Sequence, residues 1–79
     1  MAMIETNNLV AACEAIASCF IGEGPEAQAD RYAACCAFLA KALELELGLV
    51  PVSDAACHAY WSNRVGDVGT FLDGLAGGA

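Results

Sequence analysis

Apolar residues recur three and four positions apart along most of the chain, which is the spacing of an amphipathic helix. Near the N-terminus this pattern brings Leu9, Cys13, Ile16 and Phe20 onto one face. Gly22 follows shortly afterwards, and glycine readily adopts the left-handed conformation that ends many helices. We therefore predict a first helix that ends at Gly22 and buries these four side chains.

The longest helical pattern runs from Pro25 to Leu47 and is followed by Gly48. Proline suits the first position of a helix and glycine suits the position after its end. Apolar side chains cover most of the circumference, so we expect this helix, about 34 Å long at 1.5 Å per residue, to be the central element. Its two apolar stripes are Tyr32, Cys36, Leu39, Leu43 and Leu47, and Cys35, Phe38, Ala42 and Leu45.

A third helix is predicted to begin after Ser53, whose hydroxyl can accept a hydrogen bond from a free backbone amide. Asp54 follows in the first turn, where the helix dipole favours a negative charge. Gly66 and Gly69 then disturb the pattern, because each costs about 1 kcal/mol relative to alanine inside a helix. The apolar spacing is compatible with one kinked helix, but we favour a break near Gly66 and a short fourth helix capped by Asp67.

The fold class predicted from these patterns is all-α, because no segment shows the alternation of a β-strand. A chain of 79 residues forms one small domain, so we expect a single helical domain over residues 1–79. Hydrophobic residues make up 58% of it, which is too rich for a disordered chain. The expected architecture is a small bundle of three or four helices around the long central helix.

Charge narrows the choice of partner. The chain has 10 acidic and 3 basic residues and a formal net charge of −7. Three cations cannot neutralise many phosphates, which excludes non-specific binding to nucleic acid. The carboxylates are spread over every segment, and they could serve solubility alone. They could also form a negative surface that competes with nucleic acid for the basic groove of a protein partner.

The five cysteines are odd in number, and Cys35 and Cys36 are adjacent, which is unusual for a disulfide framework. No cationic start of an export signal precedes them, so we expect reduced, buried thiols and a cytoplasmic location. Zinc sites bring cysteines in close pairs that this chain lacks, so no metal or cofactor is expected. A reactive thiol at Cys35, one turn after Arg31, is the alternative. No uncharged apolar stretch approaches 20 residues, so no membrane span is expected.

The only histidine, His58, shares a helical face with Asp54 and Ser62. These are the residue types of a hydrolase triad. A triad also needs a pocket and oxyanion donors that face the nucleophile, and these normally come from different elements. We expect the three side chains to form a solvated face instead, and we expect no enzymatic activity.

Residue types typical of binding hot spots gather in the third helix at Tyr60, Trp61 and Arg64. We expect Trp61 to anchor the helix in the core, with Arg64 covering it. The second helix has a narrow polar sector, which Lys41 interrupts. The predicted partner-binding residues are Asp54, Tyr60 and Arg64 of the third helix, which we favour, and Glu26, Asp30 and Glu44 of the second.

In length, charge, alanine-rich helices and lack of a catalytic motif, the whole chain resembles small acidic proteins of bacteriophages and mobile elements, of the anti-CRISPR type. The resemblance implies a non-enzymatic inhibitor that binds a Cas subunit in the host bacterium and blocks its basic target-DNA channel or a required conformational change. We expect no direct contact with nucleic acid or membrane. The resemblance assigns no role to any residue. The alternatives are a self-associating helical scaffold, which would form homodimers, and a small thiol or metal-binding protein.

Overall fold

The computed structural model describes residues 6–20, 22–48 and 52–77, and it shows four α-helices and no strand among them. The helices are α1 (Thr6–Ser18), α2 (Pro25–Leu47), α3 (Asp54–Arg64) and α4 (Gly66–Gly77). The predicted fold class is therefore confirmed: the chain forms a small all-α bundle.

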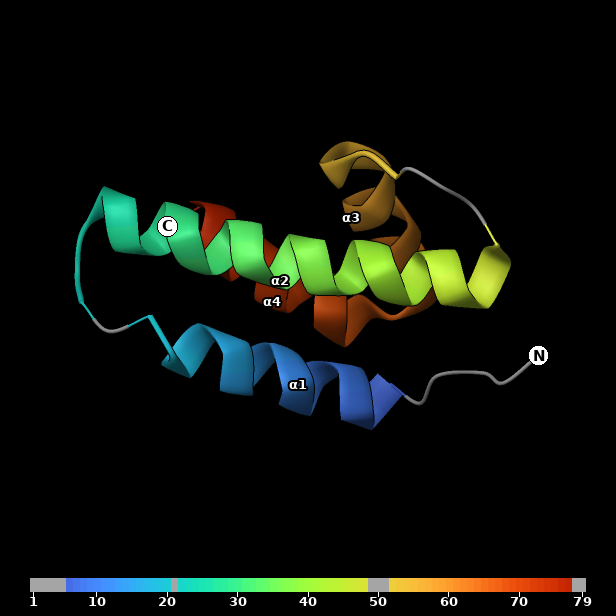
Figure 1. The fold of residues 1–79 in the computed structure, drawn as a ribbon, viewed down its shortest axis with the longest axis horizontal. Helices are drawn as coiled ribbons and strands as arrows, with labels where there is room; N and C mark the ends of the chain where they lie inside the picture. Colours follow the sequence, from blue (N-terminus) through green and yellow to red (C-terminus); the bar gives the residue numbers. More distant parts are fainter. Residues whose placement is uncertain (1–5, 21, 49–51, 78–79) are drawn as a thin grey trace.

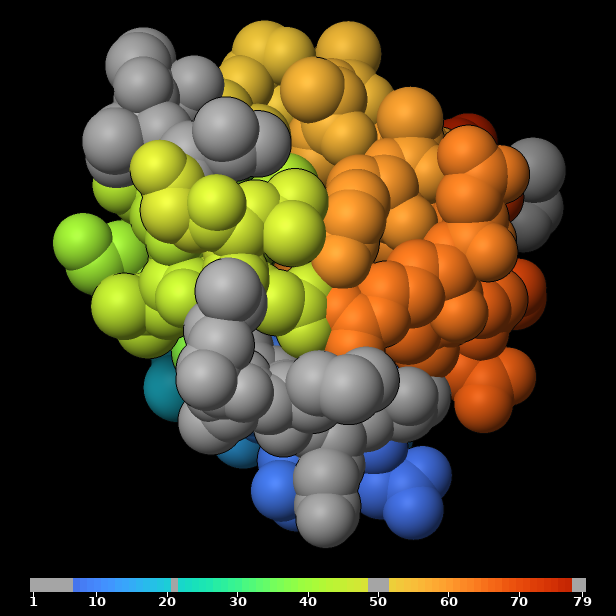
Figure 2. Space-filling model, turned by 90° about the vertical axis from the view of Figure 1, so that its right-hand side faces the viewer, coloured from blue at the N-terminus to red at the C-terminus, as the bar shows by residue number. Residues whose placement is uncertain are grey.

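The long helix α2 is the centre of the bundle, as predicted, because it packs against each of the other three helices (Figure 1). Helix α1 runs antiparallel to α2 along one side, and α3 lies on the other side. Helix α4 passes behind α2 and also contacts α1 and α3. Viewed from its end, the molecule shows the last turns of α2 packed directly against the corner between α3 and α4 (Figure 2).

Short-range signals set most of the helix boundaries. Pro25 opens α2, and Gly48 ends it in the left-handed conformation, with φ 73°. The hydroxyl of Ser53 accepts a hydrogen bond from the backbone amide of Ala56 at 3.2 Å, which caps α3. The predicted break near Gly66 is confirmed, because the preceding Val65 is extended. Asp67 is not the cap of α4, since it lies inside the first turn of that helix.

The predicted end of α1 is wrong, because the helix stops at Ser18 rather than at Gly22. The guanidinium of Arg31 donates hydrogen bonds to the backbone carbonyls of Phe20 and Gly22, at 3.2 and 3.1 Å. Arg31 thus holds the connection between the two helices, while the backbone amides of Cys19 and Phe20 close the last turn of α1 by donating to the carbonyls of Ile16 and Ala17. Phe20 consequently lies outside the helix and is 36% exposed instead of buried.

Trp61 anchors the core, as predicted. Its side chain is fully buried, and its indole N–H donates to the backbone carbonyl of Leu39 at 3.2 Å. All four helices contribute to this core. Its buried apolar residues are Leu9, Cys13, Cys35, Cys36, Leu39, Ala42, Leu43, Cys57, Trp61, Val65, Val68 and Leu72.

One stretch near the end of α2 differs from the predicted stripes. Leu45 is 70% exposed and Leu47 is 44% exposed, whereas Glu46 between them is buried. The geometry of the helix explains this exchange. Glu46 follows Ala42 by four positions and Leu43 by three, so it lies on their buried face, while Leu45 is rotated toward the polar edge.

Helices α3 and α4 meet closely at Gly69, which is buried. A Cβ atom placed on Gly69 would lie 2.4 Å from the hydroxyl oxygen of Ser62 and 2.6 Å from its Cα. A side chain at this position would therefore collide with the backbone of α3. The glycine that disturbs the helical pattern of the sequence is what allows the two helices to approach each other.

Candidate functional site

Two of the predicted hot-spot residues belong to a polar cluster that joins α3 to the end of α2. The hydroxyl of Tyr60 donates to the carboxylate of Glu46 at 2.6 Å. The guanidinium of Arg64 donates to the same carboxylate oxygen and, at 2.9 Å, to the hydroxyl oxygen of Tyr60. We call these three residues the Glu46 cluster. The hydrogen bond to Glu46 is the main reason why the pKa of Tyr60 is raised and why that of Arg64 is raised.

Arg64 also covers the aromatic side chains beneath it, as predicted. Its guanidinium carbon lies 5.6 Å from the ring centre of Trp61 and 5.8 Å from that of Tyr60, within the range of cation–π contacts. The two rings meet edge to face, with centres 5.0 Å apart. Tyr60 and Arg64 are therefore held in fixed positions while part of each side chain still reaches the surface.

Asp54 does not lie beside Tyr60 and Arg64. It is exposed at the start of α3, and at 1.5 Å per residue it is about 15 Å from Arg64 along the helix axis. It lies close enough to Tyr32 of α2 to act on its pKa. Burial first, then the thiol of Cys36 and the charge of Asp54, raise the pKa of Tyr32 to about 12. The predicted site on α3 is thus divided between the two ends of the helix.

The predicted residues of α2 form a line along its outer side. Glu26 and Asp30 are exposed near its start, whereas Glu44, near its end, is partly exposed. Glu26 and Glu44 are about 27 Å apart along the axis. Lys41 is exposed on the same side, as expected. We call these four residues the outer face of α2.

Two of the three cationic side chains bind other groups of the chain itself. Arg31 binds the carbonyls between α1 and α2, and Arg64 binds Glu46. Lys41 forms no salt bridge with another described residue. Among the described carboxylates only Glu46, paired with Arg64, and Asp73, paired with His58, form ion pairs, so most acidic side chains of these segments face solvent without one.

The polar line on α3 does not form a catalytic set. His58 is 2.7 Å from the carboxylate of Asp73 on α4, and this contact bridges the two helices. The hydroxyl of Ser62 is buried against Gly69 and has no hydrogen-bond partner in the described segments. The prediction that Asp54, His58 and Ser62 share one solvated face is therefore wrong for Ser62, which lies where α3 crosses α4.

All five cysteines are free thiols, and all except Cys19 are buried. Burial is the main reason why the pKa of Cys13 is raised to about 12 and that of Cys57 to about 11. Cys35 points toward the backbone carbonyl of Cys13, and its pKa is also raised, so it is not the reactive thiol of the alternative prediction. In the part of the chain that the structure describes, no three His, Cys, Asp or Glu residues are placed to hold a metal ion.

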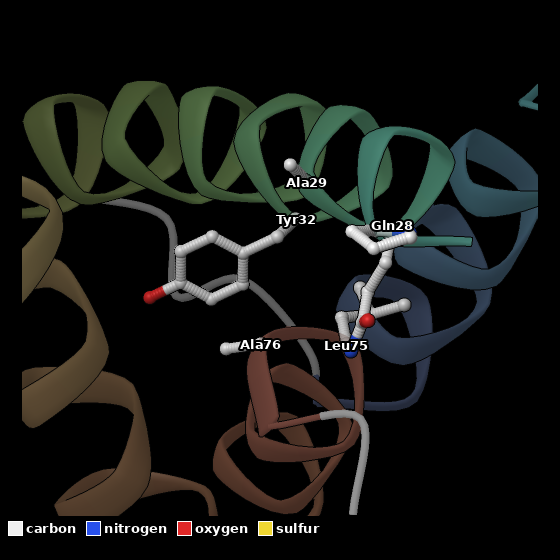
Figure 3. Close-up of a pocket in the computed structure, with 6 residues that line it drawn as sticks. Gln28, Ala29, Tyr32, Leu75 and Ala76 are labelled. Atoms are coloured by element: carbon white, nitrogen blue, oxygen red, sulfur yellow. The ribbon is translucent and has the colours of Figure 1, made fainter.

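Sequence reasoning missed a shallow groove between the start of α2 and the end of α4 (Figure 3). Its volume is about 390 Å³. The groove depends on the pairing of two segments that are far apart in the sequence, so no local pattern indicates it. Its walls are formed by Pro25, Gln28, Ala29, Tyr32, Leu75 and Ala76.

Comparison of the chain with models of protein families, with curated proteins and with solved structures found no match. None of the helices in the described segments is long and apolar enough to cross a membrane. The case for a function therefore depends on the surface of this molecule.

Proposed function

We propose that the protein is a non-enzymatic inhibitor that binds a protein partner with a basic surface. In its most concrete form it is an anti-CRISPR-type protein of the bacterial cytoplasm that binds a Cas subunit and blocks target DNA. The observation that supports this proposal is the charge distribution. The chain has a formal net charge of −7, and among the described carboxylates only Glu46 and Asp73 form ion pairs, so the other exposed carboxylates are available to attract a basic partner.

Electrostatic attraction of this kind acts mainly on the rate of association. Asp54 and the outer face of α2 supply the charge for it. Specific contacts then determine how slowly the complex dissociates. Tyr60 and Arg64 suit this second role, because the Glu46 cluster holds them in place and less conformational freedom is lost on binding.

The proposal is tested by challenging bacteria with a phage that their own CRISPR–Cas system targets, using one strain for each system type. Expression of the protein should restore plaque formation in at least one strain, and the purified protein should bind a Cas subunit of that strain. Rescue in no strain, together with no binding to any of these Cas subunits, would refute the proposal.

Rate constants against that subunit then test the two roles. Asp54→Lys should slow association, and the difference from the parent should shrink at high salt. Tyr60→Ala should speed dissociation. Asp67→Lys is the matched control, because Asp67 is also exposed but lies on α4, outside the predicted surface. Equal effects of the two charge reversals would exclude the start of α3 as the binding face.

A second function, self-association as a helical scaffold, is favoured by the exposed apolar side chains of Leu45 and Leu47 near the end of α2. Apolar association is not weakened by salt, unlike capture of a basic partner. Sedimentation velocity would show a dimer that persists at high salt, and Leu45→Glu would dissociate it. A monomer at all concentrations would leave the inhibitor as the better proposal.

A further inference from the structure

The groove between α2 and α4 combines an apolar floor with an aromatic wall. Ala29 comes from α2, Leu75 and Ala76 come from α4, and the ring of Tyr32 extends from α2 over Ala76 (Figure 3). Gln28 supplies a side-chain amide at one end, whereas the hydroxyl of Tyr32 points away from that end. A volume of about 390 Å³ is sufficient for one large side chain or a small ring system.

Negative charge lies near this groove. Asp54 is close enough to Tyr32 to act on its pKa, and Glu26, next to Pro25 in the first turn of α2, is exposed on the adjoining outer face of that helix. None of the six lining residues is cationic. Arg31, the nearest cation in sequence, directs its guanidinium to the carbonyls of the connection between α1 and α2. The groove therefore presents an apolar surface in a negative field.

The apolar lining and the negative charge near the groove determine which kind of molecule can bind in it. A second copy of this chain would carry the same net charge of −7 into a negative field, so electrostatic repulsion opposes it. A basic segment of another protein is attracted instead. An aromatic side chain buries much area at a low cost in conformational entropy and can stack on the ring of Tyr32.

We propose that the groove between α2 and α4 binds an aromatic side chain from a basic segment of the partner protein. The inference rests on the proposed function, because it takes the partner to be basic, and it adds a second contact to the one proposed at Tyr60 and Arg64. The aromatic ring lies against Tyr32, Leu75 and Ala76, while flanking cations of the segment face Glu26 and Asp54.

The test uses isotopically labelled protein and blocked five-residue peptides, followed by the shifts of backbone amide resonances. The probe is Lys-Lys-Trp-Lys-Lys, and the comparison peptides are Lys-Lys-Ala-Lys-Lys and Glu-Glu-Trp-Glu-Glu. The tryptophan probe should shift the resonances of Gln28, Ala29, Leu75 and Ala76, and it should bind at least tenfold more tightly than either comparison peptide.

Two variants separate the groove from general charge. Ala29→Arg fills the groove, whereas Ala37→Arg makes the same change of charge at an exposed position of α2 that does not line it. Both substitutions keep a good helix former, and circular dichroism verifies the fold of each variant. Ala29→Arg should weaken binding of the tryptophan probe at least tenfold, and Ala37→Arg should weaken it less than twofold.

Three outcomes would overturn the inference. Equal effects of the two variants, or equal binding of the tryptophan and alanine probes, would show that the peptide does not bind in the groove. The proposal of a basic partner would not be affected. Equal binding of the acidic probe would refute the basic chemistry of the segment. The phage challenge tests inhibition independently, so its failure is distinguishable from failure of the groove.

Discussion

Four of the five cysteines are core residues of this protein. Cys13 comes from α1, Cys35 and Cys36 come from α2, and Cys57 comes from α3, and all four are completely buried. A thiol in such surroundings behaves as a small apolar group, because burial disfavours the ionised form. The high cysteine content of the chain is thus explained by packing, and only Cys19 offers a thiol to reagents in water.

This burial predicts how the thiols react. Under native conditions Ellman's reagent should modify one thiol quickly, and the other four should react only as fast as the protein opens. In denaturant all five should react at once. Cys19→Ser is the control that should remove the fast phase completely. Two or more fast thiols in the native protein would contradict the structure.

The contact of Gly69 with Ser62 makes the absence of a side chain a packing requirement. We expect Gly69→Ala to lower the free energy of unfolding by about 1–3 kcal/mol, since overpacking forces the helices apart. Gly74→Ala is the matched control in the same helix. It has no atom within 4 Å of an added Cβ, so it should stabilise the protein by about 0.5–1 kcal/mol. Urea denaturation measures both, and equal effects would refute the close crossing of α3 and α4.

At the scale of elements, the two sides of α2 have different roles. One side is buried by the three other helices, and the other side carries the exposed carboxylates. The Glu46 cluster fastens the end of this helix to α3 through hydrogen bonds between side chains, over the buried ring of Trp61. The central helix therefore contributes both the stability and a large part of the charged surface.

Two leucines of α2 differ in burial but not in residue type, so substituting each one measures the effect of burial on stability. Leu39 is completely buried, whereas Leu45 is 70% exposed. Leu39→Ala should lower the free energy of unfolding by about 2–5 kcal/mol, which combines lost transfer energy with an unfilled cavity. Leu45→Ala should change it by less than about 0.5 kcal/mol. If thermal and urea unfolding show similar losses for both variants, α2 does not face the core as the structure shows.

The boundaries of α2 and the start of α3 could be predicted from sequence, because the residues that cap a helix act on their immediate neighbours. The end of α1 could not, since Arg31 lies nine residues beyond Gly22 and acts on it only in the folded chain. The burial of Glu46 and the exposure of Leu45 were not predicted for a different reason. The spacing of Glu46 from Ala42 and Leu43 signals its burial, but a carboxylate there requires a partner that the local sequence does not reveal.

The candidate site, like the fold, could be predicted only in part from the sequence. Tyr60 and Arg64 are recognisable as hot-spot residue types, but Glu46, which holds both, lies 14 and 18 residues away from them in sequence. The separation of Asp54 from Tyr60 follows from the length of α3. The groove depends on how the end of α4 meets the start of α2, and only the tertiary arrangement shows it.

At the scale of the whole molecule, the stability of the fold depends on the protonation of its buried thiols and of Tyr32. The four buried thiols and Tyr32 all have raised pKa values in the folded protein. A group of this kind binds its proton more tightly in the folded state than in the unfolded state. Its stabilising contribution is complete below the unfolded pKa and is lost as the pH rises toward the folded pKa.

We therefore expect the free energy of unfolding to be nearly constant from pH 7 to 8 and to fall progressively above pH 9, where thiols of the unfolded chain ionise. Urea denaturation at pH 7.5, 9 and 10.5 measures the change. Cys57→Ala should make the alkaline fall less steep than in the parent, whereas Cys19→Ser, at an exposed position, should not. A stability that rises between pH 9 and 10.5 would contradict the burial of the thiols.

Helix α4 contacts each of the three helices that precede it in the chain. On the ribosome, α1, α2 and α3 are synthesised before α4. Part of their apolar surface therefore stays exposed to solvent until the residues of α4 have been synthesised. During this interval the nascent chain is a substrate for chaperones and for association with other nascent chains. The carboxylates on the outer face of α2 are already present then, and their mutual repulsion between chains opposes aggregation before the fold is complete.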